Sequence, residues 1–384
     1  MLGRSIIENA SKEHSGRHVV LRADGLGGLI AGLRDQGFRL IGPTISDGAI
    51  GYDDVERKED LPVGWTDEQE GGHYRLKRRD DGAVFGYVVG PHAIKRFLHP
   101  PVQPLWQAVR NEDGYAFEEP AAPDRPFAFI GVRPCDIRAM AIQDRVFEGG
   151  TFKDAHYQAR RKDAFIVAVN CAEAAPTCFC TSMGSGPKAE SGFDLALTEL
   201  DPAGDHRFLL EVGSERGRRL LDSVAHEAAS AADIEAADSV SATTAASMTR
   251  SMPDNVQELL ARNLDHQRWD EVAERCLTCG NCTMVCPTCF CTNIDEDMTF
   301  DGEVIGRTRQ WTSCFGIDFA YIHGGSVRHS AQSRYRQWMT HKLSTWHDQF
   351  GESGCVGCGR CITWCPVGID ITEEANAIQD SETT

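Results

Sequence analysis

The sequence predicts two domains: an α/β N-terminal domain built on a parallel sheet, and an α-helical C-terminal domain that is rich in cysteine. Two observations support this division. A buried strand, a helix and a second buried strand follow one another between residues 127 and 169, and most of the 15 cysteines lie after residue 275. A length of 384 residues accommodates two domains. We place the boundary where the composition changes, which gives domains of residues 1–250 and 251–384.

The first 106 residues predict a helix, a strand and two irregular stretches. Apolar residues recur at helical spacing between positions 29 and 38, and residues 40–43 are typical of a strand and a turn. Asp24 stands where it is expected to cap that helix. Residues 53–82 are polar and charged, which indicates an excursion on the surface. The four prolines of residues 91–106 predict an irregular segment packed on the core.

The clearest α/β signal lies between residues 127 and 212. Residues 127–132 and 164–169 are short apolar runs that suit buried strands, and apolar side chains between positions 136 and 147 recur at helical spacing. A strand, a crossover helix and a strand predict a βαβ unit in a parallel sheet. A further strand is expected over residues 208–212.

The connection to the C-terminal domain has a distinct composition. Residues 222–252 are rich in Ala, Ser, Asp and Thr, which indicates either a surface helix with frayed ends or a flexible connector. Asp254 is then expected to cap a helix whose apolar residues run from Val256 to Val272. This helix leads the chain to Cys276, after which cysteines dominate.

Two copies of the pattern C-x2-C-x2-C-x3-C-P mark the C-terminal domain. The first copy holds Cys276, Cys279, Cys282 and Cys286, and the second holds Cys355, Cys358, Cys361 and Cys365. In bacterial two-cluster ferredoxins this pattern binds [4Fe-4S] clusters, and the fourth cysteine of each copy ligates the cluster of the other copy. We therefore expect a two-cluster ferredoxin-like domain in which Cys365 completes the first cluster and Cys286 completes the second. Gly280, Gly357 and Gly359 allow the close backbone approach that such loops need.

Two zinc sites, or two sets of free thiols, are the alternatives to this interpretation. A single C-x-x-C pair would leave zinc and redox roles open. The doubled four-cysteine pattern, with a proline after the last cysteine of both copies, favours iron–sulfur clusters. Residues 287–354 separate the copies, which is far more than a small ferredoxin needs, so we expect an inserted segment there.

Four cysteines of the N-terminal domain form a candidate site for a third cluster: Cys135, Cys171, Cys178 and Cys180. Cys135 and Cys171 each follow a predicted parallel strand, and the carboxyl ends of such strands meet at the edge where open α/β sheets bind ligands. Cys178 and Cys180 lie one short loop beyond Cys171. Four thiols in one place match the ligand number of a cubane. The alternative is that they are small buried apolar side chains, as free cysteines often are.

Three further cysteines, Cys289, Cys291 and Cys314, lie in the inserted segment and are weaker candidates for cofactor binding. Three thiols do not complete a four-ligand set, so either a nearby His or Asp is the fourth ligand or these side chains shield the neighbouring clusters. The basic stretch of residues 328–342 lies between the two motifs. It is either a solvated helix face or a device that tunes the cluster potentials or binds a partner.

Net charge and composition narrow the choice of partners. The formal net charge of −18 disfavours nucleic acid and anionic membranes as partners. No run of about 18 apolar residues is present, and residues 1–14 lack the apolar core of a signal peptide, so we expect a cytoplasmic protein without membrane insertion. In a reducing compartment so many cysteines indicate metal binding or redox chemistry rather than disulfides. The sequence does not match the dinucleotide-binding pattern G-x-G-x-x-G, because Ile30 occupies the position of its third glycine.

Several longer motifs resemble one family, the iron–sulfur beta subunits of cytosolic NAD(P)-linked [NiFe] hydrogenases, also called sulfhydrogenases. The motifs are GVRPCDIRAM, NCAEAAPTCFC, CLTCGNCTMVCPTCFC, RQWTSCF, RYRQWMTHK and CVGCGRCITWCP. The same family includes the A subunit of anaerobic sulfite reductase. The resemblance covers most of the chain, and the repeated PTCFC element and the RYRQWMTHK segment are the features that point to this family.

The resemblance implies an electron-transfer subunit that works beside a flavin subunit, which handles NAD(P)H, and beside separate catalytic subunits. The chain would then relay electrons through two, or with the N-terminal cysteines three, iron–sulfur clusters, and it would carry no catalytic residues of its own. Two alternatives remain open. One is the electron-transfer A subunit of an anaerobic sulfite reductase, and the other is a thiol- or sulfur-reducing subunit that uses the extra cysteines.

Overall fold

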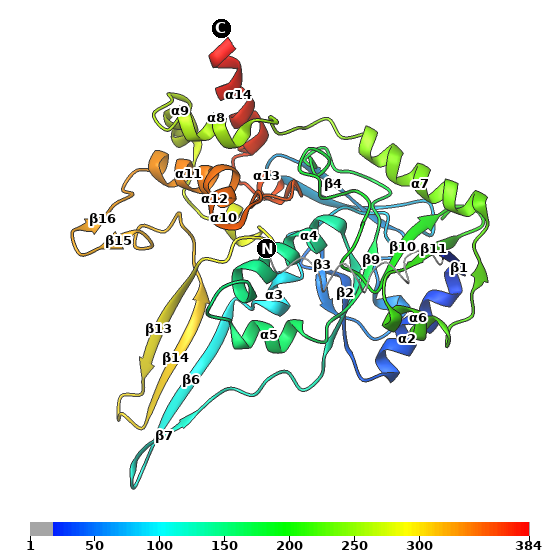
Figure 1. Cartoon of the computed structure of the whole chain (residues 1–384), viewed down its shortest axis with the longest axis horizontal. Helices are drawn as coiled ribbons and strands as arrows, with labels where there is room; N and C mark the ends of the chain where they lie inside the picture. Colours follow the sequence, from blue (N-terminus) through cyan, green and yellow to red (C-terminus); the bar gives the residue numbers. More distant parts are fainter. Residues whose placement is uncertain (1–17, 384) are drawn as a thin grey trace.

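A mixed eight-stranded sheet lies at the centre of the N-terminal part in the computed structural model, which describes residues 18–383 (Figure 1). Its strands are β1 (His18–Arg22), β2 (Arg39–Ser46), β3 (Ala49–Asp54), β8 (Phe127–Val132), β9 (Phe165–Val169), β10 (Leu195–Leu200), β11 (Arg207–Val212) and β12 (Glu227–Ala228). In the order β12-β1-β11-β10-β9-β8-β2-β3, only β10, β9, β8 and β2 are parallel neighbours. The expected parallel sheet is therefore only the middle of this sheet, because β3 and β11 add antiparallel hairpins on either side.

Helices cover both faces of this sheet. The helices on the first face are α2 (Leu26–Asp35) and α6 (Glu215–Leu221). Those on the second face are α3 (Lys95–Leu98), α4 (Pro134–Glu148), α5 (Ala155–Arg161) and α7 (Ala231–Ala246). Every residue of β8 and β9 is buried, as expected for parallel strands covered on both sides. The predicted βαβ unit is confirmed, and α4 and α5 form its crossover.

The first part of the chain is more regular than the sequence indicates. The polar residues 53–82, expected to be a surface excursion, contain the hairpin of β4 (Trp65–Glu70) and β5 (His73–Arg78). Asp24 does not cap a helix, because it lies inside a 3-10 turn, Ala23–Gly25, and α2 begins directly after that turn without a side-chain cap. The surface position of this segment fits the largely exposed or half-buried residues of the hairpin, although the segment is a regular element. The expectation of an Asp24 cap is wrong.

Residues 91–106 pack on the core as expected, but they are irregular only over residues 91–94 and 99–101. They form α3 and the first residues of β6 (Val102–Asn111), which pairs with β14 (Val304–Trp311). Pro104 is tolerated in β6 because it lies at a shift in the pairing register with β14, where a missing N–H group costs little. Proline content alone misjudged this segment.

The connection between the two parts is a helix. Of the two alternatives for residues 222–252, the surface helix is the one observed, as α7. The Ser230 side chain accepts a hydrogen bond from the Asp233 backbone, and the Asp233 side chain accepts one from the Ser230 backbone, so α7 begins in a capping box. The single helix expected after Asp254 is two helices, α8 (Val256–Arg262) and α9 (Arg268–Arg275), and Asp254 caps neither.

The C-terminal part is built from short helices around the two cysteine motifs. These helices are α10 (Asn281–Met284), α11 (Ala331–Thr340), α12 (Trp346–Phe350), α13 (Arg360–Thr363) and α14 (Ile371–Thr383). A π-helical turn, His341–Thr345, joins α11 to α12. An aromatic core that includes Trp269, Trp338 and Phe315 packs against cysteines of both motifs.

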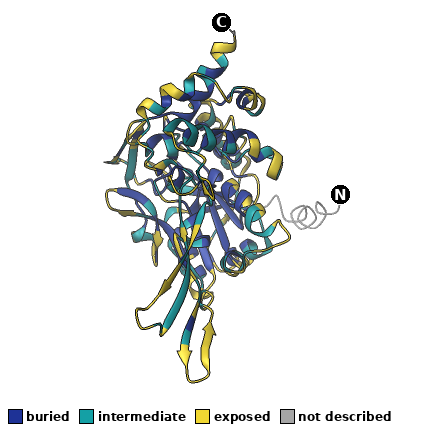
Figure 2. Ribbon diagram, turned by 90° about the vertical axis from the view of Figure 1, so that its left-hand side faces the viewer, coloured by how far each residue is buried: buried dark blue, intermediate teal, exposed yellow. Residues whose placement is uncertain are grey.

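The inserted segment forms part of an arm that projects from the body of the molecule (Figures 1 and 2). Its strands β13 (Thr292–Met298) and β14 join β6 and β7 (Gly114–Glu118) in a four-stranded antiparallel sheet of order β13-β14-β6-β7. A short hairpin, β15 (Tyr321–Ile322) and β16 (Gly325–Ser326), follows. Strands from both sides of residue 250 thus share one sheet, and the division into domains 1–250 and 251–384 stays a prediction.

None of the described helices has the length and the apolar character that crossing a membrane would require. Residues 1–14, on which the expected lack of a signal peptide rests, lie outside the described residues.

Candidate metal centre

The two C-x2-C-x2-C-x3-C-P copies fold into loops of the same shape. In the first copy the Thr278 N–H donates to Cys276 Sγ at 3.4 Å, and in the second the Gly357 N–H donates to Cys355 Sγ at the same distance. Both donor residues are left-handed, with φ of 51° and 64°. A left-handed glycine, Gly280 or Gly359, then precedes α10 or α13. The repeated sequence pattern therefore corresponds to a repeated backbone geometry.

Cysteines from both copies line one cavity of about 430 Å3 of empty space, part of it open to solvent. We call Cys276, Cys279, Cys282 and Cys365 the first thiol group, and all four line this cavity. Burial and the nearby charges of the other three thiols raise the pKa of Cys282 well above its ordinary value. Phe315, Tyr335 and Trp338 form the apolar part of the wall. Cys365 therefore lies beside the cysteines of the first copy although it belongs to the second, and Cys361 of the second copy lines the same cavity.

The second thiol group, Cys286, Cys355, Cys358 and Cys361, also lies together. Burial, followed by the charges of Cys355, Cys358 and Cys286, raises the pKa of Cys361 well above its ordinary value. Burial raises the pKa of Cys355 to about 12, and Cys358 and Cys286 are among the neighbours whose charges add to this effect. Cys286 also neighbours Cys289, which is the largest influence on its pKa. The crossed ligation by Cys286 and Cys365 therefore stays a prediction.

The residues of both groups fit [4Fe-4S] clusters. Each group offers four thiols, and in each copy a left-handed loop turns a backbone N–H toward a sulfur, as cluster-binding loops do to offset negative charge. Across residues 18–383, no three His, Cys, Asp or Glu side chains converge in the manner that a single metal ion requires. The thiols of a cubane are each bonded to a different iron, so they are spaced more widely than the ligands of one ion.

The third thiol group, Cys135, Cys171, Cys178 and Cys180, gathers beyond the carboxyl ends of β8 and β9. Cys135 lies in the first turn of α4, directly after β8, and Cys171 follows β9. Burial and then the charge of Cys171 raise the pKa of Cys178 to about 12. The charge of Cys180, in turn, contributes to raising the pKa of the buried Cys135 thiol. The sheet topology thus brings together the four thiols that the sequence singled out.

A buried arginine lies beside the third thiol group. Arg133 is 2% exposed and donates to the carbonyl oxygens of Phe85 at 2.8 Å and Tyr87 at 2.7 Å. It also interacts with Cys171. Burial raises the pKa of the Cys171 thiol, and Arg133 offsets part of this rise. Sequence reasoning missed this residue, although its place in GVRPC, two residues before Cys135, was a usable signal.

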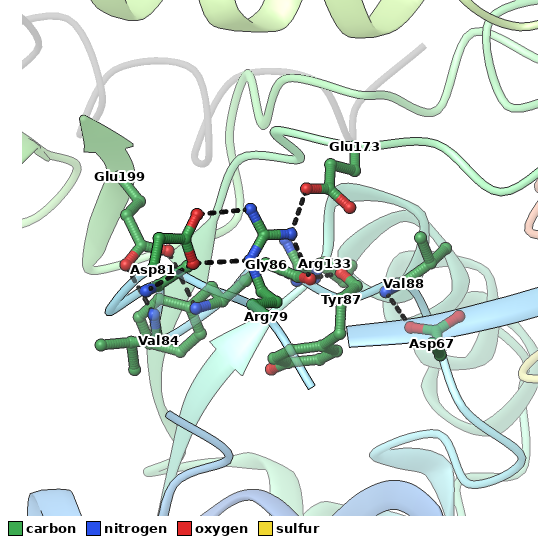
Figure 3. Close-up of polar contacts among 12 residues, drawn as sticks. Asp67, Arg79, Asp81, Val84, Gly86, Tyr87, Val88, Arg133, Glu173 and Glu199 are labelled. Atoms are coloured by element: carbon green, nitrogen blue, oxygen red, sulfur yellow. Dashed lines mark hydrogen bonds and ion pairs between the residues drawn. The ribbon is translucent and has the colours of Figure 1, made fainter. Parts of the chain in front are cut away.

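The segment that holds Arg133 is itself fixed by ionic contacts (Figure 3). The Arg79 side chain lies between Asp81 and Glu173 and donates to both carboxylates. The Glu199 carboxylate accepts hydrogen bonds from the backbone N–H groups of residues 84 and 85 at 2.7 and 2.8 Å. Asp67 of β4 accepts another from the Val88 N–H at 2.7 Å. The hairpin that sequence analysis took for a surface excursion thus helps to position the site.

The second motif packs directly on the N-terminal PTCFC element. The Phe179 N–H donates to the Gly357 carbonyl oxygen at 2.9 Å. A Cβ atom added at Gly359 would lie 2.4 Å from the Thr177 carbonyl oxygen. Cys358 lies between these glycines. Burial and other thiols are the larger causes of the raised pKa of Cys178 and Cys180, and the charge of Cys358 adds to them. The second and third thiol groups are therefore neighbours.

A buried ion pair joins the same two regions. Arg360 lies in the second motif and Asp136 follows Cys135, and both side chains are 0% exposed. The guanidinium donates to both carboxylate oxygens at 2.8 Å and to the Gly90 carbonyl oxygen at 2.9 Å. Such bidentate geometry fixes the orientation of α4 relative to the cluster-binding loop.

The three weaker candidates lie beside Cys286 and do not form a separate four-thiol set. Cys289 lies close enough to Cys286, and Cys314 close enough to Cys291, for each to be the main influence on the pKa of its neighbour. The contact with Cys314 is the main cause that lowers the pKa of Cys291 to about 7, and the nearby Lys342 adds to it. No His or Asp is recorded as their partner among the described residues. Their role as cofactor ligands stays a prediction.

A glycine substitution tests the contact between the second motif and PTCFC. Gly359→Ala is expected to lower the free energy of unfolding by more than about 3 kcal/mol, because it combines left-handed strain with a backbone clash. Gly351→Ala is the matched control, since Gly351 has φ of +75°, against +74° for Gly359, and open space around it. The control is expected to cost about 1–2 kcal/mol. Anaerobic denaturant titration measures both, and equal losses would contradict the close packing.

Comparisons with known proteins identify the C-terminal part and the family. A family model described as a 4Fe-4S dicluster domain matches residues 275–369. This match confirms the prediction of two [4Fe-4S] clusters. The sulfhydrogenase 2 subunit beta of Pyrococcus furiosus is 30% identical over 299 residues, which cover 74% of this chain and 82% of the relative. The chain therefore belongs to the family of sulfhydrogenase beta subunits, as an iron–sulfur electron-transfer subunit with a 4Fe-4S dicluster domain.

Proposed function

We propose that this chain relays electrons between a flavin subunit that oxidises NAD(P)H and the catalytic module of a [NiFe] hydrogenase, in the cytoplasm. When bound, each cluster takes up and releases one electron at a time. The observation that carries the proposal is the chain of neighbouring thiol groups inside one subunit. A relay needs such neighbours, whereas a single catalytic centre does not.

The three thiol groups follow one another through the molecule. Cys358 of the second group affects the pKa of Cys135, Cys178 and Cys180 in the third group. On the other side, Cys361 of the second group lines the same cavity as the first group. The order third, second, first therefore supports a linear path in which the second group is the middle station.

The first thiol group lies at the surface and suits an electron-transfer partner. Cys279 is exposed, and Leu277 and Val367 beside it are 61% and 39% exposed. These residues line the same cavity as the first thiol group. An apolar rim around a redox centre is typical of the small interfaces at which electron-transfer proteins meet. We propose that one partner subunit docks here, while the third group faces the other end of the path.

We also propose a third cluster, held by Cys135, Cys171, Cys178 and Cys180. Converting Cys178 and Cys180 together to serine is expected to remove about four of about twelve iron atoms per chain. The comparison variant converts Cys289 and Cys291, the equivalent pair of the second PTCFC element, to serine. Anaerobic iron and sulfide analysis of the full chain measures the result. An iron content that stays unchanged in the first variant would refute the third cluster.

Metal and flavin content of the native complex tests the function itself. A tagged full chain, purified anaerobically from its own organism, is expected to bring down nickel and flavin in fixed proportion to itself. Clusters without nickel or flavin would contradict the proposal, and sirohaem absorbance in their place would indicate the sulfite reductase alternative. The name of the Pyrococcus furiosus relative is the observation that favours the hydrogenase over that alternative.

A further inference from the structure

Two lysines are buried beside the second thiol group without carboxylate partners. Lys342 is 3% exposed and Lys95 is 5% exposed. Within the part of the chain that the structure describes, no ion pair with Asp or Glu is recorded for either lysine. A buried charge is stable only when it is paired and hydrogen-bonded. The partner charge must therefore come from another kind of group.

Lys342 directs its ammonium at a sulfur. Its Nζ lies 3.3 Å from Cys286 Sγ, and it also donates to Thr288 Oγ1 at 2.9 Å and to the Gly354 carbonyl oxygen at 3.1 Å. These three contacts account for all three protons of the ammonium group. Lys342 lies in the π-helical turn His341–Thr345, and such turns often occur at functional sites. It is the one member of the basic stretch 328–342 for which a contact with a cysteine sulfur is recorded.

Lys95 approaches the same segment from the N-terminal part but does not contact the sulfur. Its Nζ donates to the carbonyl oxygens of Cys286 at 2.9 Å and Cys289 at 3.1 Å. It also lies 3.7 Å from the centre of the Trp311 ring. Its contacts fix the backbone that carries Cys286, while Lys342 alone reaches the ligand atom.

We propose that Lys342 is a positioning residue that sets the reduction potential of the second cluster above that of the first. The proposal rests on the proposed ligation of that cluster by Cys286. One electron added to a cluster makes its thiolate ligands more negative, and a buried ammonium 3.3 Å from one of them stabilises that state. Among residues 18–383, no Lys or Arg side chain is recorded within hydrogen-bond distance of a sulfur of the first thiol group: the nearby Arg334 donates instead to the carbonyl oxygens of Phe315 and His329.

The test is an anaerobic redox titration of the full chain, followed by electron paramagnetic resonance. Lys342→Met removes the charge and keeps the length of the side chain. It is expected to make reduction of the second cluster at least tenfold less favourable, a shift of about 59 mV to more negative potential. The first cluster, identified by the signal lost in Cys365→Ala, should keep its potential. Lys342→Arg, which keeps the charge, should stay close to the wild type.

Lys95→Met is the matched control, because it removes a buried lysine that binds the same segment through carbonyl oxygens. It should shift the reduction potential of the second cluster by less than half as much as Lys342→Met does. An unchanged second potential in Lys342→Met, or an equal shift in Lys95→Met, would overturn the proposal. Lys342→Met could also fail to hold iron. In that case, wild-type iron content and second-cluster potential in Lys342→Arg would support the proposal, and their loss in Lys342→Arg would overturn it. Wild-type protein with fewer than two clusters would instead refute the proposed function.

Discussion

Replacing Cys365 with alanine is expected to remove about four iron atoms from the first cluster, although Cys365 belongs to the second sequence motif. The reason is geometric. Cys365 lines the same cavity as Cys276, Cys279 and Cys282, so its loss leaves those three thiolates without their fourth partner. Iron analysis, with resonance spectra of the remaining cluster, measures the loss.

The mirror variant, Cys286→Ala, is the control for this crossed arrangement. It should damage the cluster of Cys355, Cys358 and Cys361, because Cys286 is the expected fourth ligand of that cluster. The two variants should therefore leave different clusters intact. If each substitution disturbed only the cluster of its own motif, the grouping of thiols described above would be wrong.

Breaking the buried ion pair of Asp136 and Arg360 should have the largest effect on stability. Asp136→Ala is expected to lower the free energy of unfolding by about 3–5 kcal/mol, because the Arg360 guanidinium would stay buried without a partner charge. Asp54→Ala is a suitable control. It breaks the pair of Arg39 and Asp54, which are 40% and 52% exposed, and such exposed pairs contribute about 0.2–1 kcal/mol.

Anaerobic denaturant titration of both variants measures the difference. The double variant Asp136→Leu with Arg360→Leu should be less destabilised than Asp136→Ala, since it leaves no unpaired charge in the core. Similar losses in Asp136→Ala and Asp54→Ala would show that the buried pair does not hold α4 against the second motif.

The central strands and the cluster motifs were predictable because each depends on local sequence. Residues 127–132 are apolar throughout, and a strand that is buried on both faces requires that composition. The antiparallel outer strands were not predictable, since the direction of a strand depends on pairing with residues far along the chain. The place of Pro104 in β6 was not predictable for the same reason, because only its position at a register shift makes a proline acceptable there.

The charged surroundings of the site could not be predicted from spacing. Lys95 and Lys342 are far apart in sequence, and only the fold brings both beside Cys286 and buries them. The β4–β5 hairpin is likewise polar in sequence, yet Tyr74 stacks on Trp364 with ring centres 5.2 Å apart. Polar composition suggested a solvated surface there, whereas the hairpin covers part of the second motif.

Iron and acid-labile sulfide content, with zinc measured in the same anaerobic sample, tests the account most directly. We expect about eight iron and eight sulfide per chain for the two [4Fe-4S] clusters, and about twelve of each with the third thiol group filled. Zinc should be negligible. Protein that binds zinc and takes up fewer than about eight iron atoms after anaerobic reconstitution would contradict this expectation.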